Sequence, residues 1–80
     1  MRRLTERMNL AKTVLRELSR QPLCRTEIEQ RTVRKAGTHA TFESIFRYLV
    51  QDGYVRKIEQ KHRANYEITE KGAKLLEAIE

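Results

Sequence analysis

Four side chains that can make specific hydrogen bonds are grouped in residues 37–53: Thr41, Glu43, Ser44 and Arg47. At about 100° per residue they fall on, or directly beside, one face of a helix. Arginine can contact a guanine edge or a phosphate, hydroxyls can contact either, and a carboxylate can accept from a cytosine amino group. This pattern suits recognition of a nucleic acid. The alternative is an ordinary solvated face on which Glu43 pairs with Arg47.

A second cationic group, Lys61, His62 and Arg63, lies within residues 60–65. Lys61 and Arg63 suit backbone phosphates or the minor groove, and His62 is interpreted as a hydrogen-bonding group. Residues on both sides alternate with the period of two that is typical of strands. The connection contains no Asn-Gly or Asp-Gly pair, so we expect a hairpin with a longer loop.

A helix over residues 38–51 must position the first group. Its apolar residues recur at the offsets 0, 3, 4 and 7 that define one helix face. These residues are Phe42, Ile45, Phe46 and Leu49. The hydroxyl of Thr38 can cap the start, and Gly53 can supply the left-handed residue that follows a helix end. We therefore predict that this helix buries one apolar stripe in the core.

The opposite face of the same helix is predicted to be compact and polar. Ala40, Ser44 and Gln51 lie on it and Tyr48 flanks it, and its first two turns carry no Lys or Arg to pair with a Glu four residues away. Such a face can approach a groove closely. Thr38 and His39, at the start of the helix, complete the contact set that we predict for it.

Residues 3–20 predict a long amphipathic helix at the start of the chain. Its stripe has spacings of 4, 3, 4 and 3. The stripe consists of Leu4, Met8, Ala11, Leu15 and Leu18, widened by Val14. The opposite face carries Arg7, Lys12, Arg16 and Arg20, which are expected to be solvated or to contact a polyanion. The stripe suits either a monomer core or a dimer seam.

Pro22 breaks the periodicity after this helix, because proline has no amide hydrogen. A very short strand is expected next. Thr26 then starts a second helix, in which Glu29 completes a capping box. Ile28 and Val33 form the thin apolar side of this helix.

The rest of the chain predicts two strands and a last helix. The strand pattern covers residues 54–59 and resumes at Tyr66 and Ile68. Thr69 is expected to cap the last helix, and Gly72 is expected to permit close packing. The apolar stripe of this helix is Leu75, Leu76 and Ile79.

The chain of 80 residues has room for a single domain, residues 1–80, with one small core. Its net charge is +6, and residues 1–63 carry 15 Lys or Arg against 7 Asp or Glu. This excess favours polyanionic partners.

The single cysteine, Cys24, excludes an internal disulfide and is interpreted as a small buried hydrophobe. We expect no metal site, no cofactor and no enzymatic activity. Without a signal peptide or membrane span, a cytoplasmic, nucleoid-associated protein is expected.

Two segments, YLVQDGYVRK and NYEITEKGAKLL, resemble a signature of small MarR- and PadR-like regulators of the archaeal or archaeal-virus type. The resemblance covers roughly residues 8–80. It implies an α+β, mostly helical winged helix-turn-helix fold: helix, short strand, helix, helix, two-stranded wing, helix. It also makes residues 38–51 the recognition helix and residues 61–63 the wing tip. The chain departs from the family in having no long terminal helix for dimerisation and no evident ligand pocket.

We therefore expect a sequence-specific regulator of transcription that binds double-stranded DNA. Its helix 38–51 would enter the major groove and its basic wing 60–65 would lie on the backbone or in the minor groove. The expected assembly is a homodimer through the first helix, with the last helix beside it; any small-molecule effector is unknown. The alternatives are a winged helix used as a protein interaction module and a sequence-indifferent architectural DNA binder.

Overall fold

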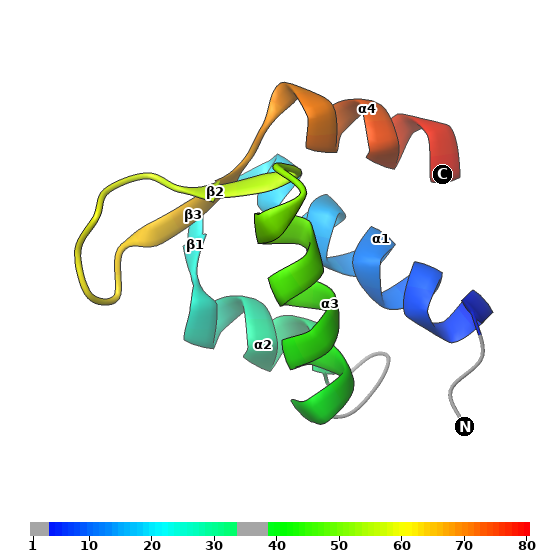
Figure 1. Cartoon of the computed structure of the whole chain (residues 1–80), viewed down its shortest axis with the longest axis horizontal. Coiled ribbons are helices and arrows are strands. Elements are labelled where there is room, and N and C mark those ends of the chain that lie inside the picture. Colours follow the sequence, from blue (N-terminus) through cyan, green and yellow to red (C-terminus); the bar gives the residue numbers. More distant parts are fainter. Residues whose placement is uncertain (1–3, 34–38) are drawn as a thin grey trace.

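A computed structural model describes residues 4–33 and 39–80, with side chains described from Arg7 onward (Figure 1). The elements are α1 (Leu4–Arg20), β1 (Leu23–Cys24), α2 (Arg25–Val33), α3 (His39–Gln51), β2 (Val55–Lys57), β3 (Asn65–Ile68) and α4 (Glu70–Ile79). This is the predicted order of helices and strands, and the α+β, mostly helical class is confirmed. The predicted cap at Thr38 lies outside the described residues, as does the side chain of Leu4. None of the described helices is long and apolar enough to cross a membrane.

The three strands form one small antiparallel sheet in the order β1-β3-β2. Leu23 lies opposite Tyr66 on one side of β3, and Lys57 lies opposite the same residue on the other side. The loop over residues 58–64 extends beyond the sheet, away from α1 and α4 (Figure 1). β2 is shorter than predicted: it ends at Lys57, and Ile58 is 46% exposed in the loop.

The buried stripe of α1 is confirmed at Ala11, Val14, Leu15 and Leu18, but it differs from the predicted one nearer the start of the helix. Leu10 is fully buried, although it lies outside the predicted stripe, whereas Met8 is 41% exposed. The cause is tertiary, because α1 packs against α2, α3, α4 and β3 and is covered on more than one side. The described buried apolar residues of α1 are Leu10, Ala11, Val14, Leu15 and Leu18.

The widened buried face of α1 includes a carboxylate, Glu17, which is 5% exposed. Its two oxygens lie 3.6 Å from Arg20 Nη1 and 3.5 Å from Arg31 Nη1 of α2. A buried charge needs such partners, because removing it from water is otherwise costly. The buried hydroxyl of Thr32 is also satisfied, since it donates to the carbonyl oxygen of Ile28 at 2.7 Å. The ion pair between Glu17 and Arg31 therefore joins α1 to α2 in addition to their apolar contacts.

The predicted capping box at the start of α2 is wrong. The helix begins at Arg25, so Thr26 is an exposed residue inside it. Glu27 accepts a hydrogen bond from the Cys24 amide at 3.4 Å, which is the contact that the third residue of a helix makes with the preceding cap position. The start is displaced because Cys24 pairs with Asn65 in the sheet and leads directly into the helix. Cys24 is half-buried, not buried as predicted.

The core stripe of α3 is confirmed. Phe42, Ile45, Phe46 and Leu49 are all buried. The rings of Phe42 and Phe46 stack with centroids 5.4 Å apart, and Phe46 meets Tyr66 edge-on at 4.9 Å. Such ring pairs add stability beyond the area that they bury. α3 is therefore anchored to the sheet through its aromatic side.

The end of α3 is a Schellman turn. Tyr54 N donates to Leu49 O at 2.8 Å and Gly53 N donates to Val50 O at 3.1 Å. Gly53 has φ +82°, the left-handed conformation that glycine adopts without steric cost. The predicted helix end at Gly53 is therefore confirmed.

α4 is fixed against this turn. Thr69 caps α4 as predicted, because its Oγ1 accepts from Gly72 N at 3.1 Å and donates to Gly53 O at 2.6 Å. A Cβ atom at Gly72 would overlap the carbonyl oxygen of Tyr54 and lie 2.8 Å from Ile68 Cγ1, which confirms the close packing predicted there. Of the predicted stripe of α4, Leu76 is buried and Leu75 and Ile79 are half-buried.

Candidate nucleic-acid interface

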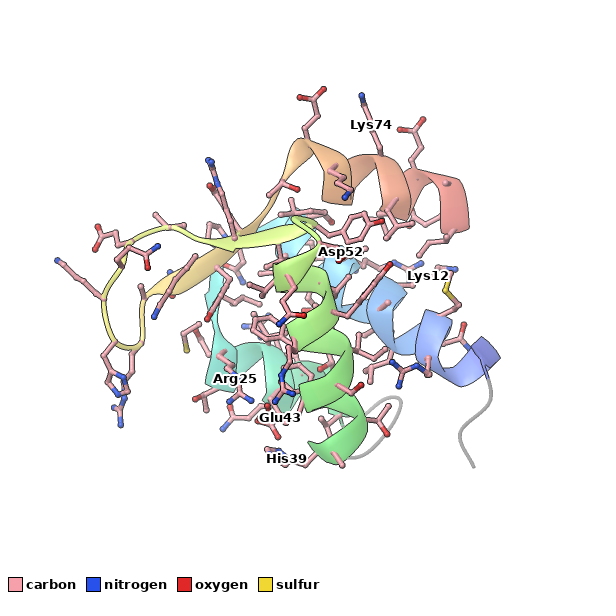
Figure 2. All side chains as sticks on the ribbon, viewed as in Figure 1. Lys12, Arg25, His39, Glu43, Asp52 and Lys74 are labelled. Carbon is pink, nitrogen blue, oxygen red and sulfur yellow. The ribbon has the colours of Figure 1, made fainter. Side chains whose placement is uncertain are left out.

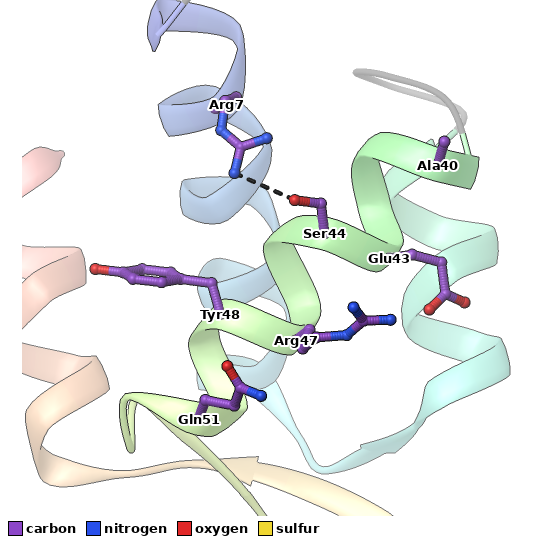
Figure 3. Close-up of a pocket in the computed structure, with 7 residues that line it drawn as sticks. All are labelled: Arg7, Ala40, Glu43, Ser44, Arg47, Tyr48 and Gln51. Carbon is purple, nitrogen blue, oxygen red and sulfur yellow. Dashed lines mark hydrogen bonds between the residues drawn. The ribbon is translucent and has the colours of Figure 1, made fainter.

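The outer face of α3 borders an open hollow of about 420 Å³ beside the first turns of α1 (Figure 3). We call it the α1–α3 hollow. Its lining residues are Arg7, Ala40, Glu43, Ser44, Arg47, Tyr48 and Gln51. Five of these seven belong to the predicted polar face and Tyr48 flanks it, and the burial of the opposite stripe turns this face outward. Thr41 is half-buried at the edge of this face.

Arg7 joins this face from α1. Its Nη2 donates to Ser44 Oγ at 3.3 Å across 37 positions of sequence (Figure 3). The predicted contact set omits Arg7, although the sequence places it on the cationic side of the first helix. Periodicity within one helix cannot show which neighbouring helix that side approaches.

Glu43 is held by α2. Its carboxylate forms an ion pair with Arg25, and His39 Nε2 lies 3.6 Å from it (Figure 2). His39 Nδ1 also contacts Glu29, so the start of α3 is linked to α2. The alternative in which Glu43 pairs with Arg47 is therefore wrong, because α2 brings Arg25 to the same carboxylate. The guanidinium of Arg25 also lies 5.8 Å from the ring centre of Phe42.

Arg47 is exposed on the middle of the outer face. Among the described residues, no hydrogen bond, ion pair or ring contact engages its guanidinium. A guanidinium offers five donors in a planar fork that fits two acceptors at once. Arg47 is therefore available for an external acceptor such as a guanine edge or a phosphate.

The tip of the 58–64 loop presents the second predicted group. Ala64 N donates to Lys61 O at 3.2 Å, which closes a turn over His62 and Arg63. Lys61, His62 and Arg63 are all exposed, and Lys61 lies 3.3 Å from Glu59. Arg63 has φ +63°, a left-handed conformation that is unfavourable for a residue with a Cβ. The turn therefore holds a long cationic side chain at a position where glycine or asparagine would cost less.

A second hollow, of about 570 Å³, separates this loop from the start of α2. We call it the loop–α2 hollow. Its lining residues are Cys24, Arg25, Thr26, Lys57, His62, Arg63, Ala64 and Tyr66. Arg25 lines this hollow and pairs with Glu43, which lines the other, so the two hollows meet at that ion pair. Together they form one surface from Arg7 to Arg63.

The charge of this combined surface is strongly positive. Its described lining residues include five Lys or Arg side chains, and Glu43 is the one carboxylate among them. Such a balance favours a polyanion, because neutralising phosphates releases condensed counterions. The two linings include Glu43, Ser44 and Arg47 of the first predicted group and His62 and Arg63 of the second, whereas Thr41 and Lys61 are not part of them. The structure adds Arg7, Arg25 and Lys57.

The described residues contain no group of three or more His, Cys, Asp or Glu side chains placed to hold a metal ion. The sequence matches no family model, and it matches neither a curated protein nor a solved structure.

Proposed function

We propose that this chain is a winged helix-turn-helix domain that binds double-stranded DNA as a sequence-specific regulator of transcription. In this proposal α2 and α3 form the helix-turn-helix, α3 enters the major groove, and the 58–64 loop is the wing. The observation that carries the proposal is the set of five Lys or Arg side chains that line the two hollows, which meet at the Arg25–Glu43 ion pair.

The shape of α3 supports this reading. The major groove is about 12 Å wide and admits one α-helix when the exposed side chains are compact. Ala40 and Ser44 are small, and they lie on the outer face together with Arg47 and Gln51. Arg47 is therefore the proposed guanine or phosphate contact, and Ser44 and Thr41 are proposed to contact base edges or phosphates.

The wing residues supply contacts that do not depend on sequence. Lys61 and Arg63 would hold backbone phosphates or enter the minor groove, and His62 would donate a hydrogen bond to the backbone. Because Arg63 and Lys57 face the loop–α2 hollow with Arg25, one DNA strand could pass between the loop and α2.

Selection of bound sequences from a random duplex library tests the proposal. The full chain should enrich a defined motif, and Arg47→Ala should change or abolish that motif. Arg16→Ala is the matched control, because Arg16 is exposed on α1 and pairs with Glu80 at 3.3 Å, outside both hollows. Binding without enrichment would indicate an architectural DNA binder. No binding to any duplex would favour the protein interaction module and overturn the proposal.

We also propose that the domain binds DNA as a homodimer, since one module of this size contacts only about 600 to 1,000 Å² of DNA. Ala11, Leu15 and Leu18 of the predicted seam are buried within the monomer. Within the predicted seam on α1 and α4, the described apolar side chains that remain accessible are Met8 and the half-buried Leu75 and Ile79.

Light scattering over a concentration series tests the dimer. The wild-type mass should rise toward twice that of the chain, and Met8→Glu should return it to the monomer value. A monomer mass at every concentration, together with DNA footprints that lack two-fold symmetry, would contradict the dimer.

A further inference from the structure

Arg7 belongs to neither α3 nor the 58–64 loop, yet its guanidinium is part of the α1–α3 hollow. It is half-buried and donates to the neutral hydroxyl of Ser44. No carboxylate within the described residues forms an ion pair with it. The hydroxyl of Ser44 does not neutralise the charge of this guanidinium, and the other N–H donors of Arg7 remain available for an anion.

The other groups around this hollow also suit an anion. Ser44, Arg47 and Gln51 can donate hydrogen bonds. Tyr48 adds a phenol, whose pKa is raised above its ordinary value by a hydrogen bond with Tyr54. Glu43 is the exception, but its charge is engaged by Arg25. The α1–α3 hollow therefore combines two guanidinium groups with neutral donors.

The position of Arg7 relative to α3 gives these donors a specific target. A helix in the major groove has a phosphate backbone on each side. Arg25 and the 58–64 loop lie on one side of α3. Figure 3 shows Arg7 on the other side, across α3 from Glu43. A duplex on the outer face of α3 would thus bring its second backbone to Arg7.

We infer that the α1–α3 hollow binds one backbone phosphate of the duplex, with Arg7 as its main ligand and Ser44 as a second donor. This inference rests on the proposed function and extends it. It makes α1 a third DNA-contacting element, opposite the wing. Because Arg7 would contact phosphate and not a base, its contribution is the same for every sequence.

The test compares Arg7→Ala with Arg16→Ala in the full chain, on a selected duplex and on a random duplex, between 50 and 200 mM salt. Both variants lose one positive charge from α1, but Arg16 lies outside the hollow. The slope of log K against log salt is negative, and loss of one phosphate contact should reduce its magnitude by about 0.9. Arg7→Ala should then lose about 3.5-fold less affinity over this salt range than the wild type does. We expect this on both duplexes, and we expect Arg16→Ala to keep the wild-type slope.

Arg7→Lys should restore most of the slope, because it restores the charge. If thermal melting shows that Arg7→Ala does not fold, Arg7→Gln is measured in its place, since it keeps a donor for Ser44 without the charge. A wild-type slope for the neutral variant would overturn the phosphate site while leaving DNA binding intact. An affinity loss confined to the selected duplex would overturn it in favour of a base contact through Ser44. A wild-type chain that binds no duplex would overturn both this inference and the proposed function.

Discussion

The two faces of α3 are held by different kinds of contact. The inner face is apolar, and Phe42 and Phe46 pack against rings and aliphatic side chains that exclude water. The outer face is polar, and its groups meet side chains from α1 and α2, such as Arg7 and Arg25. Burial of the inner face contributes strongly to the free energy of unfolding, whereas the exposed ion pairs of the outer face contribute little to it. The outer face is therefore free to vary for binding without loss of the fold.

Phe46→Ala should break the inner face and have the largest effect. Removing a buried aromatic ring costs about 3 to 5 kcal/mol of unfolding free energy, a large part of what a domain of this size has. Urea denaturation followed by circular dichroism measures the change. Arg47→Ala, one residue along but on the outer face, is the control and should unfold like the wild type. An unchanged midpoint for Phe46→Ala would contradict the packing of α3.

Gly72→Ala tests the packing of α4 against the turn that ends α3, and it should destabilise the fold. The added Cβ would overlap the carbonyl oxygen of Tyr54, so α4 must shift, at an expected cost of about 3 kcal/mol. Lys74→Ala, on the exposed side of α4, should change stability by less than about 0.5 kcal/mol. In an unpacked helix, Gly to Ala would instead add about 1 kcal/mol of stability. A higher melting temperature for Gly72→Ala would thus refute the contact with Tyr54.

Arg47→Ala tests the outer face by itself. We expect the free energy of specific DNA binding to weaken by about 1 to 3 kcal/mol, with relaxed preference at one base pair, while folding is unchanged. Titration of a selected duplex and its single-base variants measures both effects. Equal losses on selected and random duplexes would make Arg47 a phosphate contact. Unchanged affinity would remove it from the site.

Glu43→Gln should have the smallest effect and the opposite sign. It removes the one described carboxylate of the combined surface and releases Arg25 from its ion pair. Binding to any duplex should then tighten by about 0.5 to 1 kcal/mol, in the range of exposed charge pairs. Glu77→Gln makes the same charge change on α4 and should have less effect. If Glu43→Gln weakened binding to one sequence alone, Glu43 would instead read a base, as a cytosine contact would require.

The parts of the fold that sequence reasoning predicted are those governed by neighbouring residues. The inner stripe of α3 follows from a helical period, and the turn at Gly53 follows from the steric freedom of glycine. The cap at Thr69 likewise needs only a hydroxyl three residues before an amide. The positions of these elements could therefore be predicted from the sequence, and so could the outward orientation of the polar face of α3.

The errors occur where distant segments meet. Met8 and Leu10 exchange places relative to expectation because α1 is covered by several elements, which no period within α1 reveals. The capping contact of α2 moves to Glu27 because β1 pairs with β3 before the helix begins. In the α2 case a tertiary contact outweighed a local capping preference of about 1 kcal/mol.

The candidate site divides in the same way. The sequence by itself determined that Ser44 and Arg47 share an exposed helix face, because backbone geometry fixes that relation within a few residues. Only the tertiary structure decided which side chains lie next to them. Arg7 donates a hydrogen bond to Ser44 across 37 positions of sequence, and Glu43 forms its ion pair with Arg25 of α2, not with Arg47. The physical reason is that side-chain partners between elements depend on how helices pack, and the packing is set by the whole core at once.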